Sequence, residues 1–150
     1  MSATQRALRM PEIVSSIILH LDAVWSYHSR RRAHYLFCCL LVNKLWYREA
    51  VWYLWRHICF GGVWIPVDHY FQPIAPERRQ FYADLVEATS LHYCYKYKNK
   101  HPDLDGLIFP RLTSLAYYTE VAFEDVGYPP PAINAPRLKH ITWRTCTWDC

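Results

Sequence analysis

The stretch that decides the fold of this chain is FPRLTSLAYY at residues 109–118, which recurs as APRLKHITWR at residues 135–144. Both copies contain a Pro-Arg-Leu string followed by apolar side chains that alternate with other residues. Alternation with a period of two is typical of a β-strand with one buried face. Leu91 and Tyr93 alternate with polar neighbours in the same way. The sequence therefore predicts three equivalent strands.

The spacing of these strands indicates an internal repeat. Aligning Leu91, Leu115 and Ile141 gives separations of 24 and 26 residues, within the 20–29-residue period of leucine-rich repeats. The third copy matches the leucine-rich string best, with apolar or Cys residues at the required positions: Leu138, Ile141, Trp143, Cys146 and Trp148. We predict a short α/β solenoid segment. An alternative stays open, in which the strands are unrelated elements of an α+β domain.

The alternation also predicts which side chains are buried. Leu91, Leu115 and Ile141 form one expected buried column, and Tyr93, Tyr117 and Trp143 form the next. The opposite face is expected in three outward rows: Ser90 with Ser114 and His140, His92 with Ala116 and Thr142, and Cys94 with Tyr118 and Arg144. Solenoid proteins bind partners on such a face. The candidate substrate-facing residues are His92, Tyr118, His140, Thr142 and Arg144, which are equally well explained as solvated strand residues.

The N-terminal third of the chain is predicted to be helical. Residues 10–21, MPEIVSSIILHL, carry one apolar stripe at helical spacing, and Pro11 suits the first helical turn. Apolar periodicity returns at residues 36–41 and again after Asn43, which is a candidate N-cap. Residues 22–34 lack a stripe and are predicted to form a polar connection, with a short turn of helix as an open alternative. The basic run Arg30-Arg31-Arg32 lies in it, either as a solvated loop or as an import or phosphate-contacting patch.

A linker is predicted to follow these helices. Gly61-Gly62 favours an irregular backbone, and prolines at 66, 73 and 76 agree with it. Residues 77–86 are then predicted to form an amphipathic helix before the first strand. The expected organisation is a helical module over residues 8–60, a linker over 61–76 and a repeat-like segment over 77–150, which together make an α+β chain.

Composition excludes several classes of protein. The chain has 150 residues, of which 52% are apolar and 17% aromatic, so it is not a disordered chain. It has neither the ~20-residue apolar run of a membrane helix nor a signal peptide, so we expect no membrane partner. Six cysteines without a secretory signal indicate reduced thiols in the cytoplasm, the nucleus or both. The net charge of +4 is too small to require a nucleic-acid partner.

Catalytic and cofactor motifs are not found. Four glycines cannot form a phosphate-binding loop, and the six cysteines include no C-x2-C pair for zinc. His57 and Cys59 are close in sequence, but no third group completes a nucleophilic site. We therefore predict a protein that is not an enzyme and has no catalytic residue, no metal and no cofactor.

The N-terminal module resembles the F-box, in the form found in fungal F-box and leucine-rich-repeat proteins. The resemblance covers residues 8–58. It rests on MPEIVSSIILHL, on LLVNKLW at residues 40–46, which is similar to the family's Val-x-Lys/Arg-x-Trp signature, and on LWRHI at residues 54–58.

This resemblance implies a substrate-recognition subunit of a Skp–cullin–F-box ubiquitin ligase, in which the helices bind the Skp adaptor and the repeats bind an unknown protein substrate. It places these residues against the adaptor, with Trp46 expected to contribute most: Met10, Pro11, Ile13, Val14, Ile17, Leu21, Leu40, Val42 and Trp46. A small helical module with this many apolar side chains needs a partner to cover some of them. The alternatives are an ordinary helical fragment, a scaffold unrelated to ubiquitination, a truncated product and, less favoured, a nucleic-acid binder that uses the arginine run and the Tyr/Lys strand.

Overall fold

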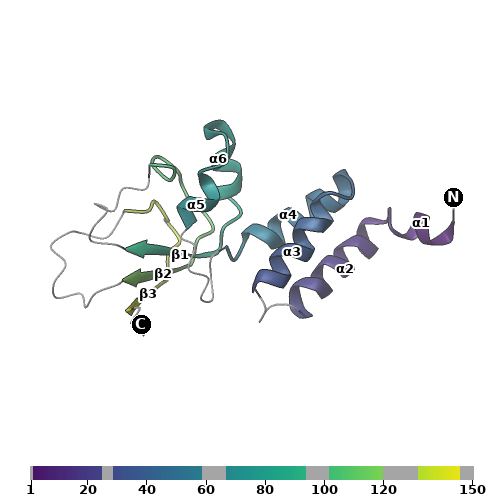
Figure 1. Cartoon of the computed structure of the whole chain (residues 1–150), viewed down its shortest axis with the longest axis horizontal. Helices are drawn as coiled ribbons and strands as arrows, with labels where there is room; N and C mark the ends of the chain where they lie inside the picture. Colours follow the sequence, from purple (N-terminus) through teal and green to yellow (C-terminus); the bar gives the residue numbers. More distant parts are fainter. Residues whose placement is uncertain (1, 25–28, 59–66, 94–101, 120–131, 146–150) are drawn as a thin grey trace. The chain divides into compact units, whose positions relative to one another are not determined.

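A computed structural model describes residues 2–24, 29–58, 67–93, 102–119 and 132–145 of the chain (Figure 1). The chain divides into two compact units, Met1–Arg56 and His57–Cys150. The first unit is helical, and the second combines short helices with a three-stranded parallel sheet. This mixture of helices and sheet agrees with the predicted α+β class.

Four helices form the first unit: α1 (Ala3–Ala7), α2 (Pro11–Val24), α3 (Ser29–Leu40) and α4 (Lys44–Trp55). The prediction that Pro11 begins a helix is confirmed. The predicted N-cap is also confirmed, because Asn43 Oδ1 accepts hydrogen bonds from the backbone N–H groups of Leu45 and Trp46 at 2.9 and 3.2 Å. This cap satisfies two N–H groups that would otherwise have no partner in the helix.

The core of the first unit lies where α2, α3 and α4 pack against one another. Each helix supplies two buried side chains at helical spacing: Val14 and Ile18, Leu36 and Cys39, and Trp46 and Ala50. Burial of these stripes holds the helices together through the hydrophobic effect. The apolar periodicity seen in the sequence therefore does produce a core.

The predicted polar connection over residues 22–34 is wrong at both ends. Helix α2 continues to Val24, and α3 already begins at Ser29. Polar side chains of this segment form ion pairs inside the unit and are not left in solvent. Arg32 donates to Asp22 Oδ1 from Nε at 2.7 Å, and Arg56 pairs with the other carboxylate oxygen. The Arg32 side chain is 11% exposed and has a structural role, so it is not part of a solvated loop.

In its described residues the second unit contains two helices, α5 (Val67–Phe71) and α6 (Pro76–Ala83), and three strands, β1 (Ala88–Tyr93), β2 (Ser114–Thr119) and β3 (His140–Thr145). Helix α5 lies inside the predicted linker over 61–76, so that segment is not irregular throughout. Residues 59–66, which include Gly61-Gly62, lie outside the described part. Val67 and Phe71 are fully buried. They are an i, i+4 pair, so they lie on the same face of α5. The predicted helix over 77–86 is confirmed but ends earlier, at Ala83.

The strands pair in parallel in the order β1-β2-β3 (Figure 1). The predicted register is confirmed between β2 and β3, where Leu115 lies opposite Ile141. It is wrong by two residues at β1, because Thr89 and not Leu91 lies opposite Leu115. The separation of equivalent residues is therefore 26 at both steps. Period-two alternation cannot detect this shift, since a strand moved by two residues keeps the same buried face.

The backbone before each strand explains why the true period is uniform. Thr113 N–H donates to Glu87 O at 2.9 Å, and Lys139 N–H donates to Thr113 O at 2.9 Å, both across 26 residues. Tight turns at equivalent positions precede all three strands, with Val86, Leu112 and Leu138 each donating to the carbonyl three residues earlier. The turns set the register, and the alternation of the strands follows it.

Burial of the predicted columns is confirmed only in part. Leu91, Leu115 and Tyr117 are buried as expected, whereas Ile141 and Trp143 are 54% and 42% exposed. The reason is their place in the sheet: within the described ranges, β3 is an edge strand that pairs with β2 on one side alone. The Tyr93 side chain, Cys94, Cys146 and Trp148 lie outside the described part.

Candidate functional site

The nine residues predicted to bind an adaptor occupy three different environments in the first unit. Val14 and Trp46 are core residues, 0% and 9% exposed. The prediction that Val14 contacts a partner is wrong because its side chain is inaccessible, whereas Trp46 keeps a small exposed fraction. Both lie on the helix faces that α2 and α4 turn toward each other and α3. Spacing alone did not distinguish core positions from surface positions, because both belong to the same apolar stripe.

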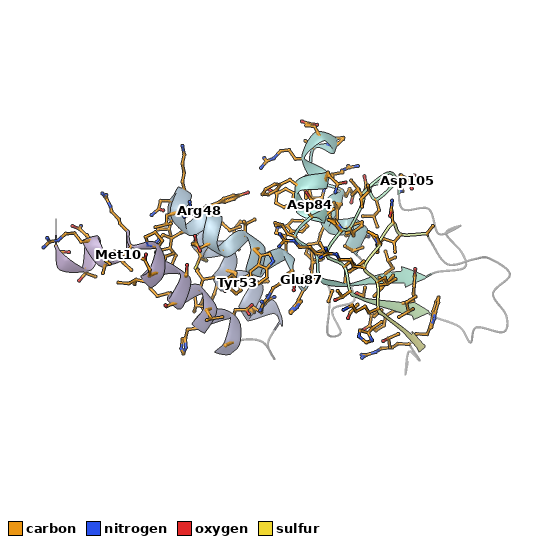
Figure 2. All side chains as sticks on the ribbon, turned by 180° about the vertical axis from the view of Figure 1, so that it is seen from behind. Met10, Arg48, Tyr53, Asp84, Glu87 and Asp105 are labelled. Atoms are coloured by element: carbon orange, nitrogen blue, oxygen red, sulfur yellow. The ribbon has the colours of Figure 1, made fainter. Side chains whose placement is uncertain are left out.

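The remaining seven residues are accessible to different degrees. Four of them are half-buried at the margins of the core: Ile13, Ile17, Leu21 and Leu40. Met10, Pro11 and Val42 are exposed. Met10 lies in the connection between α1 and α2 (Figure 2), and Val42 lies in the connection between α3 and α4.

Two exposed apolar residues beside this set were missed in the sequence. Leu41 is 72% exposed next to Val42, and Leu8 is 39% exposed two residues before Met10. The sequence did contain a signal for exposed apolar residues. Residues 40–42 are all apolar and directly precede the Asn43 N-cap of α4, and a connection this short cannot bury every one of its side chains. Helix connections therefore carry much of the exposed apolar surface of this unit.

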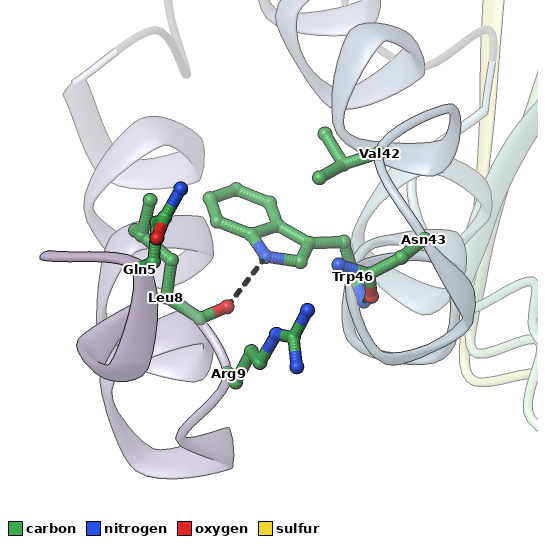
Figure 3. Close-up of a pocket in the computed structure, with 6 residues that line it drawn as sticks. All are labelled: Gln5, Leu8, Arg9, Val42, Asn43 and Trp46. Atoms are coloured by element: carbon green, nitrogen blue, oxygen red, sulfur yellow. Dashed lines mark hydrogen bonds between the residues drawn. The ribbon is translucent and has the colours of Figure 1, made fainter. Parts of the chain in front are cut away.

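A groove opens between the end of α1 and the connection from α3 to α4 (Figure 3). Its volume is about 230 Å³, and six residues line it: Gln5, Leu8, Arg9, Val42, Asn43 and Trp46. The indole Nε1–H of Trp46 donates to Leu8 O at 3.1 Å, which ties the segment after α1 to α4 across the groove. Trp46 is thus buried by its own chain and still forms part of the groove wall.

Local hydrogen bonds already use several polar groups of the groove. Asn43 Oδ1 caps α4, and Gln5 Oε1 accepts from Ser2 N–H at 2.9 Å. Ser2 Oγ in turn accepts from Gln5 N–H, which forms a capping box at the start of α1. The Arg9 side chain has no hydrogen-bond or ion-pair partner in the ranges that the structure describes. The lining therefore offers apolar surface and one free guanidinium.

The five substrate-facing candidates lie on β1, β2 and β3, and their alignment across the strands differs from the prediction. The observed register places His92 opposite Tyr118 and Tyr118 opposite Arg144, so His92 does not align with Thr142. His140, Thr142 and Arg144 are exposed on β3, and Tyr118 is half-buried. The Arg144 guanidinium lies 5.9 Å from the centre of the Tyr118 ring, in cation–π range. The His92 side chain lies outside the described part.

The predicted outward face is less open than expected. Ser90 and Ala116, assigned to that face, are only 3% and 5% exposed. Small side chains on a sheet are readily covered by larger neighbours, so alternation does not make every second residue accessible. Accessible side chains on this face are therefore concentrated on β3.

Reactive groups in the described part are few. Burial, with a smaller contribution from neighbouring Cys38, raises the pKa of the Cys39 thiol, and burial raises the pKa of Tyr117. Both shifts favour the neutral form. Exposed Cys38 lies 3.8 Å from His34 Nε2; Cys59 lies outside the described part. Among the residues described, no three His, Cys, Asp or Glu side chains gather as metal ligands, and no helix is suited in length and apolarity to cross a bilayer.

Comparisons with known proteins found no match for this chain among protein-family models, curated proteins or solved structures.

Proposed function

We propose that this chain is a substrate-recognition subunit of a Skp–cullin–F-box ubiquitin ligase. In this proposal the first unit binds the Skp adaptor and the second binds a target protein. The observation that carries the proposal is the surface of the first unit, where Met10, Leu41 and Val42 remain 49%, 72% and 57% exposed beside the groove. Exposed apolar side chains that cluster on a folded unit are typical of a protein interaction site.

The local sequence agrees with this proposal. The F-box resemblance rests on the segments that form α2, the α3–α4 connection and α4. Without the buried Val14, the contact set keeps Met10, Pro11 and Val42 as its exposed members and Trp46 as part of the groove wall. The half-buried residues Ile13, Ile17, Leu21 and Leu40 would then border the contact.

The second unit supports a repeat-like role for the sheet. Its strands, preceding turns and backbone hydrogen bonds recur every 26 residues, within the 20–29-residue range of leucine-rich repeats. In the proposal, the exposed side chains of His140, Thr142 and Arg144, with Tyr118, contact the target protein. Holding that target near the ubiquitin donor raises its effective concentration, and no residue of this chain needs to perform chemistry. Such a ligase subunit would act in the cytoplasm or nucleus.

The test is binding of the purified full chain to a purified Skp adaptor, measured by isothermal titration calorimetry. We expect Val42→Glu to weaken binding at least about tenfold, because a carboxylate would enter an apolar contact. Val42 is exposed, so this variant should keep the fold, whereas a change at core residue Trp46 would also disturb folding.

Leu19→Glu is the matched control. Leu19 is 54% exposed on α2, close to the value for Val42, and does not belong to the proposed contact. Equal affinity of the wild type and Val42→Glu would contradict the proposed surface. Absence of binding by the wild type would contradict the adaptor function and favour a scaffold unrelated to ubiquitination.

A further inference from the structure

The groove of the first unit combines an apolar wall with the Arg9 guanidinium, which has no hydrogen-bond or ion-pair partner among the described residues. We propose that it binds a single bulky apolar side chain from a partner segment, with a carboxylate next to that side chain in the segment. The inference rests on the proposed function in one respect: it takes the Skp adaptor as the protein that carries the segment. The chemistry of the occupant follows from the size, lining and charge of the groove and from the charge of the unit around it.

The size of the groove selects the kind of occupant. Pockets that enclose small molecules typically measure about 300–1,000 Å³, and this groove measures about 230 Å³. It is therefore smaller than the usual site for a metabolite or cofactor. A single large side chain inserted from a partner's surface suits this volume, and such inserted anchors often dominate binding energy.

The chemistry of the wall selects an apolar side chain. Leu8, Val42 and the indole of Trp46 supply apolar surface (Figure 3). The Trp46 Nε1–H and the Asn43 Oδ1 are already engaged within the unit. A polar side chain inserted here would lose its hydrogen bonds to water without replacing them at these two groups, which costs free energy.

The charge around the groove selects an acidic neighbour. Arg9 lines the groove, and its guanidinium has no partner in the described part of the chain. A carboxylate matches the fork of N–H groups on a guanidinium and forms a charge-assisted hydrogen bond with it. The occupant should therefore place a carboxylate beside its apolar side chain.

The charge of the whole unit favours the same partner. Residues 1–56 contain eight Lys and Arg against three Asp and Glu, whereas residues 57–150 contain nine against ten. Asp22 is paired with Arg32 and Arg56, and Glu49 accepts from Ser15 and Arg48. The net charge of +4 for the chain thus arises from a formal +5 on the unit that contains the groove, which would steer an acidic segment toward it.

The first experiment measures adaptor binding by Arg9→Glu at low and high salt, with Arg48→Glu as the control. Arg48 is 71% exposed on α4 and does not line the groove. We expect Arg9→Glu to weaken binding roughly five- to tenfold and to reduce its salt dependence, because an exposed attraction becomes a repulsion. Arg48→Glu should change affinity less than about twofold.

The second experiment needs no adaptor. The ¹⁵N-labelled full chain is titrated with a pentapeptide that has a central leucine between pairs of glutamates, and the Trp46 indole Nε1–H signal is followed by NMR. Two control peptides replace the leucine with alanine or the glutamates with lysines. We expect a saturable shift of this signal with the first peptide alone.

The two experiments separate the possible failures. If Arg9→Glu binds the adaptor as the wild type does, and Val42→Glu does not bind, the inference is overturned and the proposed function stands. If the wild type does not bind the adaptor, the proposed function fails, and the peptides alone decide the chemistry of the groove. Equal shifts with the glutamate and lysine peptides would overturn the acidic preference, and equal shifts with leucine and alanine would overturn the apolar anchor.

Discussion

At the scale of single residues, Asp22 has the largest structural role that the sequence did not predict. Its carboxylate lies between the guanidinium groups of Arg32 and Arg56 and so connects α2 with α3 and with the end of α4. Arg32 also donates to Tyr53 O, and the Arg56 guanidinium lies 4.7 Å from the centre of the Trp52 ring. One carboxylate therefore organises two arginines that would repel each other without it.

Replacing Asp22 by Asn should lower the free energy of unfolding by about 3 kcal/mol. The side chains of Asp22, Arg32 and Arg56 are 8%, 11% and 19% exposed, and removing one partner of a buried ion pair leaves charge without compensation. Urea unfolding of the full chain, followed by far-UV circular dichroism, measures the change. Glu12→Gln, an exposed carboxylate on the same helix, should cost less than about 0.5 kcal/mol. Equal losses in the two variants would show that the buried pair contributes little.

Cys38 and Cys39 should differ strongly in reactivity. Cys38 is exposed and Cys39 is buried, and the pKa of Cys39 is raised, mainly by burial. At pH 8 Cys39 therefore has less of the reactive thiolate as well as less access to reagent. We expect iodoacetamide to alkylate Cys38 first, as measured by peptide mass spectrometry, and the difference to disappear in denaturing urea. Faster alkylation of Cys39 in the folded chain would contradict the burial of that side of α3.

At the scale of elements, the three strands show how turns and side chains share the control of register. The alternation located all three strands and the pairing of β2 with β3, because a buried face imposes a period of two. It misplaced β1 by two residues, because Leu91 and Thr89 lie on the same face and Leu91 is the more apolar. The backbone hydrogen bonds from Thr113 N–H to Glu87 O and from Lys139 N–H to Thr113 O span the 26-residue step, and side-chain type does not reveal them.

Leu115 and Ile141 test the difference between neighbouring strands. They are paired positions on one face of the sheet, yet Leu115 is 1% exposed and Ile141 is 54% exposed. We expect Leu115→Ala to cost about 2–5 kcal/mol, since it leaves a cavity, and Ile141→Ala less than about 1 kcal/mol. Thermal and urea unfolding of the full chain measure both. Similar losses would mean that β3 is covered as well as β2.

At the scale of the whole molecule, the two units differ in charge and in surface. The helical unit carries the cationic excess, the groove and the exposed apolar residues at its helix connections. The second unit carries the sheet, with its accessible face concentrated on β3. This division agrees with the proposal of two binding functions in one chain.

Binding of the Skp adaptor should therefore protect one unit selectively. At about 100 times its dissociation constant, a partner that binds only the folded form adds about 2.7 kcal/mol of stability. We expect hydrogen exchange, followed by mass spectrometry, to slow at residues 8–13 and 40–46 and to stay unchanged in β1, β2 and β3. Val42→Glu should remove this protection and Leu19→Glu should retain it. Protection confined to the strands would show that the adaptor binds the second unit and would contradict the proposed surface.

The sequence by itself determined features that depend on residues close along the chain: the start of α2, the Asn43 cap, the three strands, and the pairing of β2 with β3. Only the tertiary structure decided that Val14 and Trp46 belong to the core, that Asp22 and Arg32 are buried together, that α5 packs inside the expected linker, and that Ile141 is exposed. The physical reason is that local geometry follows from backbone preferences and short spacing, whereas burial depends on which distant segments come to cover a side chain.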